Sequence, residues 1–203
     1  HADHIGGLEY LALFNRYIAQ SKKRPKLKMI VTKKYQKILW ECSLRGGMEW
    51  NETSSSGEKL NFPDYFVPVY PKLIKRSPRL IYELDFDGIH FELFGTNHIP
   101  DNAQTQKQAF PSFGLFVDNR LMISCDTKFD PELISRYADR SEVMFHDTSM
   151  QPNPVHASLP QLQTLPADIK KKIYLMHYGD DWAKYDISEF AGFARQGFRY
   201  IFD

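Results

Sequence analysis

The 203-residue chain carries 26 lysine and arginine residues against 25 aspartate and glutamate residues. This balance excludes a uniformly basic nucleic-acid-binding protein. No apolar run is long enough for a membrane span, and the two cysteines, Cys42 and Cys125, are too few for a disulfide scaffold, so we expect a single cytoplasmic domain over residues 1–203.

The first four residues, His1-Ala2-Asp3-His4, place two imidazoles and a carboxylate within four positions. These groups bind zinc, iron and manganese, and a carboxylate can also act as a base. A chance cluster of polar surface residues is the alternative interpretation. Because chain ends fray and a metal ligand needs a rigid support, we expect the natural chain to begin upstream of His1.

The next part of the chain alternates helices with one strand. Apolar residues at helical spacing predict a helix from Leu8 to about Gln20. Residues 27–31 predict a short buried strand. Thr32 is a suitable N-cap for a second helix that reaches about Leu44 and ends at Gly46-Gly47.

The segment 61–71 alternates aromatic residues with prolines, so it cannot be a central strand. It is either a segment that covers the core or a rim that stacks on a planar ligand. In the second case Tyr65, Phe66 and Tyr70 are the aromatic residues that we expect to stack on a base.

The rest of the chain is rich in strands, and we see no internal repeat. Two hairpins are predicted, one at residues 79–85 and 89–94 with its turn at Asp87-Gly88, and one at residues 113–117 and 121–124 with its turn at Asp118-Asn119. The further predicted elements are a helix at 130–138, a strand at 142–145, a helical segment at 159–171 broken at Pro166, a strand at 173–176, a helix at 188–195 and a strand at 198–202.

Three of the predicted apolar strands are each followed by a residue that can bind a metal ion. These residues are His98, Asp126 and His177. Taken singly, a histidine after a strand is usually a hydrogen-bonded surface or core residue, and an aspartate there is usually a turn or cap residue. Because strand ends are held by the sheet, the three together predict a metal site beside the sheet.

These motifs resemble the metallo-β-lactamase fold. The resemblance rests on the HxDH start with Ile-Gly-Gly after it, on His98, on Cys125-Asp126-Thr127 and on Leu175-Met176-His177-Tyr178. It implies an α/β fold, an αββα sandwich, whose first strands and first motif histidine precede His1. Cys125 departs from the family pattern because glycine is usual at that position.

The resemblance also implies two bound divalent ions, zinc or else manganese or another divalent metal. One ion would take the upstream histidine together with His1 and His98. The other would take Asp3, His4 and His177, and Asp126 would bridge the two. Two such ions can hold an attacking hydroxide and neutralise a phosphate.

Two later motifs resemble the tRNase Z-like phosphodiesterase branch of that fold. They are His146-Asp147-Thr148 and His156-Ala157-Ser158. The resemblance implies that Asp147 orients His156, which donates a proton to the leaving oxygen, while Asp3 accepts the proton of the attacking water. The alternative is that both residues are loop caps.

The interval between His98 and Asp126 has no room for the protruding arm with which the tRNA-processing members of that branch grip their substrate. This spacing disfavours the tRNA-processing enzymes. The chain resembles the small anti-Pycsar phosphodiesterases of the same branch in its compactness, in its HxDHIGG start and in the pair of Asp147 and His156. That resemblance implies hydrolysis of 3′,5′-cyclic mononucleotides to 5′-monophosphates, a homodimer, and the host cytoplasm if the chain is phage-encoded. One alternative is a tRNA 3′-processing endoribonuclease, although the near-neutral charge of the chain disfavours tRNA binding. The other is a non-enzymatic binding module.

Overall fold

The protein is described from a computed structural model that covers residues 1–105 and 107–202. The chain divides into two compact units, His1–Pro71 and Lys72–Asp203, which are described one at a time. The expectation of a single domain over residues 1–203 stays a prediction. Among the described residues, no helix is both long enough and apolar enough to cross a membrane.

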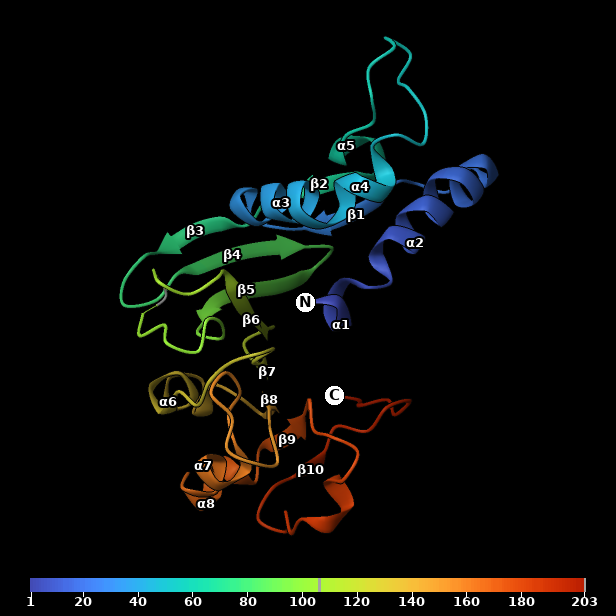
Figure 1. The fold of residues 1–203 in the computed structure, drawn as a ribbon. Coiled ribbons are helices and arrows are strands. Elements are labelled where there is room, and N and C mark those ends of the chain that lie inside the picture. The colour runs from blue at the N-terminus through green and yellow to red at the C-terminus, as the bar shows by residue number, and fades with distance from the viewer. Residues whose placement is uncertain (106, 203) are drawn as a thin grey trace. The chain divides into compact units, whose positions relative to one another are not determined.

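The first unit combines helices with a two-stranded parallel sheet (Figure 1). Its elements are α1 (Ala2–Ile5), α2 (Leu8–Phe14), β1 (Leu27–Ile30), α3 (Lys33–Leu39), α4 (Arg45–Met48), α5 (Phe62–Tyr65) and β2 (Phe66–Val69). A π-helical turn at Asn15–Ala19 and a 3-10 turn at Gln20–Lys22 continue α2. A π-helical turn at Trp40–Leu44 continues α3. Both helices predicted for this part of the chain and the strand between them are therefore confirmed. The strand is not buried as predicted, because the residues of β1 are half-buried or exposed.

The caps of the second helix are partly as predicted. Thr32 Oγ1 accepts a hydrogen bond from the Tyr35 N–H group at 3.2 Å, which confirms Thr32 as the N-cap. The predicted end at Gly46-Gly47 is wrong, because both glycines lie within α4. A Cβ atom at Gly47 would collide with the carboxylate of Glu9. This glycine therefore allows the side chain of an α2 residue to approach the α4 backbone closely.

The aromatic and proline-rich segment 61–71 contributes to the core of the first unit. Tyr65 and Phe66 are almost fully buried, and the Phe66 ring lies 4.9 Å from that of Phe62. The core-covering interpretation is confirmed. The alternative of a stacking rim is wrong for Tyr65 and Phe66, since buried rings have no face free for a base. Tyr70 is partly exposed, and the Nζ atom of Lys33 lies 5.4 Å above its ring.

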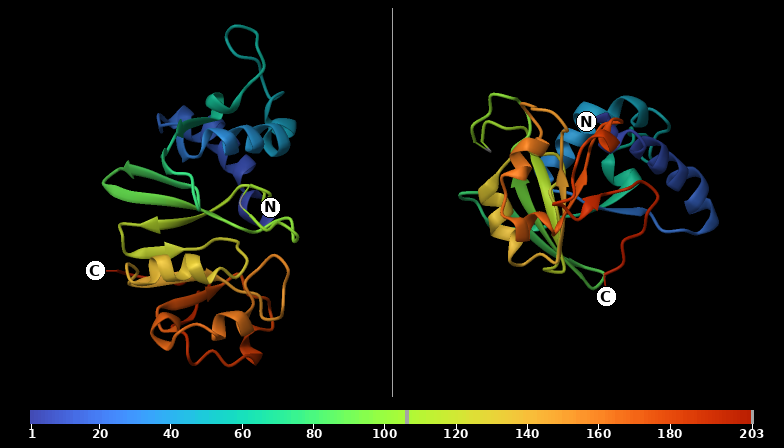
Figure 2. Two further views of the ribbon diagram at one scale, coloured as in Figure 1. Left: turned by 90° about the vertical axis from the view of Figure 1, so that its left-hand side faces the viewer. Right: turned by 90° about the horizontal axis from the view of Figure 1, so that it is seen from below.

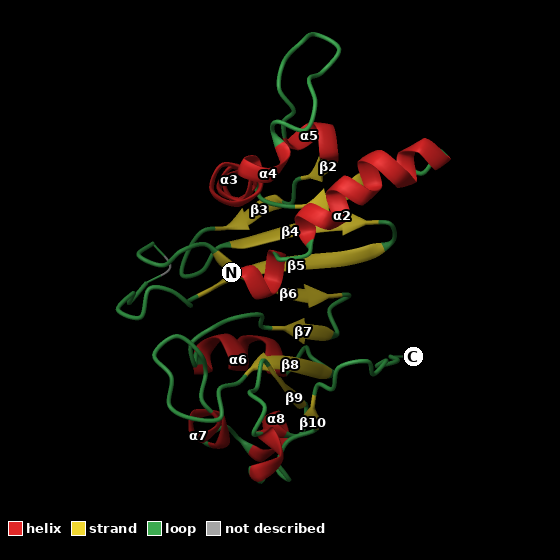
Figure 3. Cartoon of the chain, turned by 45° about the vertical axis from the view of Figure 1, so that its right-hand side comes forward, coloured by secondary structure: helices red, strands yellow, loops and turns green. Residues whose placement is uncertain are grey.

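The second unit is built on one eight-stranded sheet, in the order β10-β9-β8-β7-β6-β5-β4-β3 (Figure 3). Its strands are β3 (Lys72–Lys75), β4 (Ile81–Phe86), β5 (Ile89–Thr96), β6 (Ser112–Val117), β7 (Leu121–Ile123), β8 (Val143–Asp147), β9 (Ile173–Met176) and β10 (Gly192–Phe193). Its helices are α6 (Pro131–Ala138), α7 (Leu159–Gln163) and α8 (Ala167–Lys170). Strands β3 to β7 pair antiparallel, and β7 to β10 pair parallel.

The two predicted hairpins are confirmed, together with their turns. Asp87 and Gly88 have φ values of 50° and 83°, and Asp118 and Asn119 have 50° and 55°. Two successive positive φ angles are the geometry that matches the twist of a tight hairpin. Strand β3 was not predicted; it is a short edge strand with a lysine at each end, which gives little apolar alternation to detect.

The core of the second unit lies on one face of the sheet. Phe94, Phe116, Met122 and Met144, which come from four successive strands, are fully buried there. Residues of α6 and α7 complete this core, and Figure 2 shows both helices on the same side of the sheet. The fold is thus α/β, with a large mixed sheet and helices, while the αββα sandwich itself stays a prediction.

The predictions for the end of the chain are wrong. Residues 188–195 do not form a helix but include the short strand β10, and residues 198–202 form no regular strand. Gly192 has a φ of 140°, which no helix uses. The Tyr200 hydroxyl accepts from the Arg195 N–H at 3.0 Å and donates to the Phe193 carbonyl at 3.2 Å, so a side chain supplies the bonds that a strand partner would.

Candidate functional site

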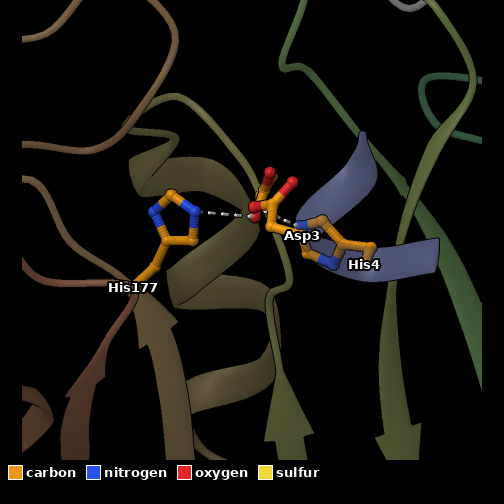
Figure 4. Close-up of side chains that lie close together, drawn as sticks. Asp3, His4 and His177 are labelled. Carbon is orange, nitrogen blue, oxygen red and sulfur yellow. Dashed lines mark ion pairs between the residues drawn. The ribbon is translucent and has the colours of Figure 1, made fainter. Parts of the chain in front are cut away.

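A group of polar side chains gathers at one edge of the sheet of the second unit. Strands β7, β8 and β9 run parallel, so their carboxyl ends meet at that edge. Asp126 follows β7, and Asp147 is the last residue of β8. His177 directly follows β9 (Figure 4). His98 comes just after β5, whose direction is the same as that of β7. The topology therefore explains why residues so distant in sequence lie close together.

Asp126 lies between two imidazoles. Its Oδ2 atom is 3.5 Å from Nε2 of His98, and its Oδ1 atom is 3.9 Å from Nε2 of His177. Asp126 and His98 are buried, whereas His177 is exposed. The three strand-end residues that the sequence singles out are thus brought together within one unit, with the two carboxylate oxygens facing different nitrogens.

The orientation of His98 is fixed by the backbone. Its Nδ1 atom lies 2.9 Å from the carbonyl oxygen of Val155. A carbonyl can only accept, so Nδ1 carries the hydrogen and the Nε2 atom of the neutral ring has its lone pair toward Asp126. A histidine held in this tautomer by a carbonyl is the usual form of a metal ligand.

Asp147 and His156 form a second pair beside the first. The Asp147 side chain is fully buried, and its Oδ2 atom lies 2.8 Å from Nδ1 of His156. Oδ2 of Asp147 also accepts a hydrogen bond from the Thr127 N–H group at 2.8 Å. Oδ1 of Asp147 lies 3.5 Å from Nδ1 of His177. The His156 ring is 4.8 Å from that of His98 and 4.5 Å from that of His177. The predicted Asp147–His156 pair therefore exists and adjoins the strand-end residues.

The backbone beside this site adopts a conformation that L-residues seldom take. Cys125 has a φ of 49° and His177 a φ of 64°. A non-glycine residue in this left-handed region costs roughly 1–2 kcal/mol. The geometry explains why glycine would suit the Cys125 position. Strain at two residues around one cluster is typical of functional sites.

The cluster carries concentrated negative charge. Burial and the nearby carboxylates of Asp126 and Asp147 raise the pKa of the Cys125 thiol to about 11. Among the described residues, no hydrogen bond reaches the buried Oδ1 atom of Asp147. Buried carboxylates are stabilised by hydrogen bonds, by a paired cationic side chain or by a metal ion. The ring nitrogens and carboxylate oxygens assembled here are ligands of zinc and manganese, so the residues present fit a divalent metal.

The N-terminal motif belongs to the first unit. Asp3 and His4 are exposed residues of α1 (Figure 4), and Oδ2 of Asp3 lies 3.5 Å from Nε2 of His4. His1 stands at the N-cap of that helix. The predicted ligand set includes residues of both units, and its assignment to one metal centre stays a prediction. Its members are His1, Asp3, His4, His98, Asp126 and His177.

A pocket beside His177 was missed by the sequence analysis. It has a volume of about 630 Å³, and its lining includes Trp182, Arg195 and Phe198. The prediction of a helix at 188–195 and a strand at 198–202 hid it, because those elements would have dispersed these side chains. The available signals were Gly179 and Gly197, which mark loops on both sides of the pocket.

Comparison with protein families gives one match over most of the chain: the family described as "Anti-Pycsar protein Apyc1" matches residues 1–200. Among similar proteins, "Anti-Pycsar protein Apyc1" of Paenibacillus harenae is 35% identical over 187 residues, which is 91% of this chain and 68% of that protein. The protein of the same name from Bacillus phage BSP38 is 33% identical over 210 residues, covering 99% of this chain and 74% of that protein. The protein of the same name from Bacillus phage vB_BsuM-Goe3 is 31% identical over 208 residues, covering 97% of this chain and 73% of that protein.

Proposed function

The chain belongs to the anti-Pycsar Apyc1 family, and we propose that it counters Pycsar signalling by hydrolysing 3′,5′-cyclic mononucleotides to 5′-monophosphates. The observation that carries this proposal is the cluster of His98, Asp126 and His177 beside the Asp147–His156 pair. The names of the relatives support the biological role, and the cluster supports the chemistry. The place of action would be the cytoplasm, that of the host if the chain is phage-encoded.

Divalent metal ions, zinc or else manganese, would be held by His98, Asp126 and His177. From the sequence motif alone, we propose that His1, Asp3 and His4 supply further ligands and that Asp126 is shared by two ions. Bound ions of this kind neutralise a phosphate and lower the pKa of a water molecule.

The chain's own residues would move the protons of the reaction. Attack of water forms a new oxygen–phosphorus bond, and the bond from phosphorus to the ribose 3′ oxygen breaks. Asp3 accepts the proton of the water, and His156 gives a proton to the leaving 3′ oxygen. Asp147 holds Nδ1 of His156, which leaves Nε2 as the nitrogen that faces the substrate.

The mixed sheet with helices on one face supports the metallo-β-lactamase sandwich and the tRNase Z-like branch as the proposed fold. The homodimer is likewise proposed from that resemblance. Processing of tRNA 3′ ends gains no support from the matches reported above, all of which are anti-Pycsar proteins.

The test uses zinc- and manganese-loaded protein, metal analysis and hydrolysis of cyclic AMP, GMP, CMP and UMP. Asp126→Asn should lower bound metal and abolish turnover while the circular dichroism spectrum stays native. Asp85→Asn is the matched control, because Asp85 is an exposed carboxylate that pairs with His90 at 2.7 Å. Full activity in Asp126→Asn, or turnover that survives complete removal of metal, would refute the proposal.

A further inference from the structure

The pocket beside His177 is lined by two loop segments of the second unit, residues 177–182 and residues 194–198. Its volume of about 630 Å³ lies within the usual range of small-molecule sites, roughly 300–1,000 Å³. We infer that this pocket binds the nucleobase of a cyclic mononucleotide. The inference rests on the proposed function and extends it from the phosphate to the base.

Aromatic side chains give the pocket surfaces on which a base can stack. The Trp182 ring packs 5.0 Å from Phe193 and 5.9 Å from Tyr178, so the core of the unit holds it in place. Phe198 is 63% exposed. An exposed phenylalanine in a pocket offers a flat apolar face to a ligand, and stacking on such faces accommodates any nucleobase.

Arg195 marks where a planar group fits between these rings. Its guanidinium carbon lies 6.0 Å from the Trp182 ring centre and 5.6 Å from the Phe198 ring centre. A guanidinium is flat, as a base is, and it stacks on aromatic faces. A base would take a place against one of these rings. The N–H groups of Arg195 would then donate to acceptor atoms on the edge of the base.

Several bonds hold the two loops in position before any ligand arrives. The Tyr178 hydroxyl donates to the Ala194 carbonyl at 2.9 Å and thereby ties the two segments together. Gly197, with a φ of 79°, permits the turn in which the Phe198 N–H bonds to the Arg195 carbonyl at 3.3 Å. A pocket organised in this way loses less conformational entropy on binding.

The pocket adjoins the reacting site through His177. This residue lines the pocket, and its ring lies 3.9 Å from Asp126 and 3.5 Å from Asp147. A ligand in the pocket can therefore extend from the aromatic rings to the strand-end cluster. Among the described lining residues, Arg195 and Asp180 carry opposite charges, so the pocket suits a base and one phosphate better than a polyanion.

The experiment compares Phe198→Ala and Arg195→Gln with two matched controls from the residues that follow this segment, Phe202→Ala and Arg199→Gln. Phe202 and Arg199 are exposed and do not line the pocket. The metal-loaded proteins are assayed on cyclic AMP and on bis(p-nitrophenyl) phosphate, which has no base. Both pocket variants should raise KM for cyclic AMP about tenfold or more and lower the ratio of kcat/KM on cyclic AMP to that on the aryl diester. The controls should match the wild type.

Equal KM values for cyclic AMP in Phe198→Ala and Phe202→Ala would overturn the inference, as would equal losses of kcat/KM on the two substrates. A wild-type protein that hydrolyses neither substrate would instead refute the proposed function. In that event, calorimetric measurement of cyclic AMP binding still tests whether the pocket binds the base. Binding that weakens about tenfold in Phe198→Ala would support it, and no binding to the wild type would overturn it.

Discussion

Nδ1 of His156 lies 2.8 Å from Oδ2 of Asp147, whose carboxylate is fully buried. Because the Thr127 N–H holds the same oxygen at 2.8 Å, the carboxylate is fixed by the backbone as well as by the imidazole. Such a pair orients one ring nitrogen and stabilises the charged imidazolium. A carboxylate partner on Nδ1 suits a proton donor and a metal ligand alike, so bound metal and kcat must both be measured in His156 variants to separate the two roles.

Replacing His156 by alanine should leave bound metal unchanged and lower kcat on cyclic AMP by about 10²-fold or more, the loss expected for a missing general acid. The loss should be smaller on bis(p-nitrophenyl) phosphate, because p-nitrophenolate leaves without needing a proton. The measurements are metal analysis and steady-state kinetics on both substrates.

The control for this variant is His90→Ala. His90 also pairs with a carboxylate, since its Nδ1 atom lies 2.7 Å from Oδ1 of Asp85. This surface pair should have no effect on kcat. A His156→Ala variant that loses metal, or that is impaired equally on good and poor leaving groups, would argue against the proton-donor role.

Asp147 and His156 should act as one unit. Asp147→Asn keeps the volume of the side chain but removes its charge, so His156 loses both its orientation and its support for a positive charge. If the pair acts together, the double variant should be about as slow as the worse single variant. The measurement is a double-mutant cycle of kcat on cyclic AMP, and effects that simply multiply would mean that the two residues act independently.

Much of the second unit could be predicted because its strands carry regular signals. The hairpin turn at Asp87-Gly88 and the helix predicted at 130–138 are encoded by local residue types, and both are found as expected. The strand-end positions of Asp126 and His177 follow in turn, since apolar runs end just before them. Their meeting at one edge results from parallel pairing, which the sequence does not specify locally.

The remaining features depend on contacts between distant residues. Residues 198–202 contain the aromatic and β-branched residues of a strand, yet Tyr200 instead packs on Phe145 and Tyr174 at ring distances of 5.1 Å. Gly47 resembles a helix end in sequence, but its lack of a side chain serves the close approach of Glu9. No local pattern distinguishes these uses, because each is decided by a partner far away along the chain.

A buried polar contact should contribute measurably to the stability of the second unit. The Tyr137 hydroxyl donates to the carboxylate of Glu92, and both residues are buried. Burial, together with that carboxylate, raises the pKa of Tyr137. Tyr137→Phe should lower the free energy of unfolding in urea by about 1.5–3 kcal/mol, the usual value for a hydrogen bond to a charged group.

The matched control is Tyr10→Phe, because Tyr10 is 74% exposed and its hydroxyl can bond to water instead. It should change the free energy of unfolding by less than about 0.5 kcal/mol. If Tyr137→Phe changed the free energy of unfolding as little as Tyr10→Phe, the hydrogen bond from Tyr137 to Glu92 would not contribute measurably to stability.

His146 should make the protein less stable in mild acid. Burial lowers the pKa of its fully buried imidazole, although the backbone carbonyl of Asp147 at 2.8 Å partly opposes this effect. Below about pH 6.5 the unfolded chain binds a proton that the folded chain does not, so the free energy of unfolding falls with falling pH.

His146→Asn can still donate to the Asp147 carbonyl but does not titrate. Between pH 7.5 and pH 5.5, the urea midpoint of metal-free wild type should therefore fall more than that of His146→Asn. Parallel shifts in the two proteins would show that other groups cause the acid sensitivity.

The central claim is tested most directly by incubating the metal-loaded protein with cyclic AMP, GMP, CMP and UMP beside a 3′-extended tRNA, at low and high salt. The account predicts 5′-monophosphates from at least one cyclic nucleotide, an intact tRNA, and rates that respond only mildly to salt, because one phosphate is bound. Efficient trimming of the tRNA with no turnover of any cyclic nucleotide would contradict it.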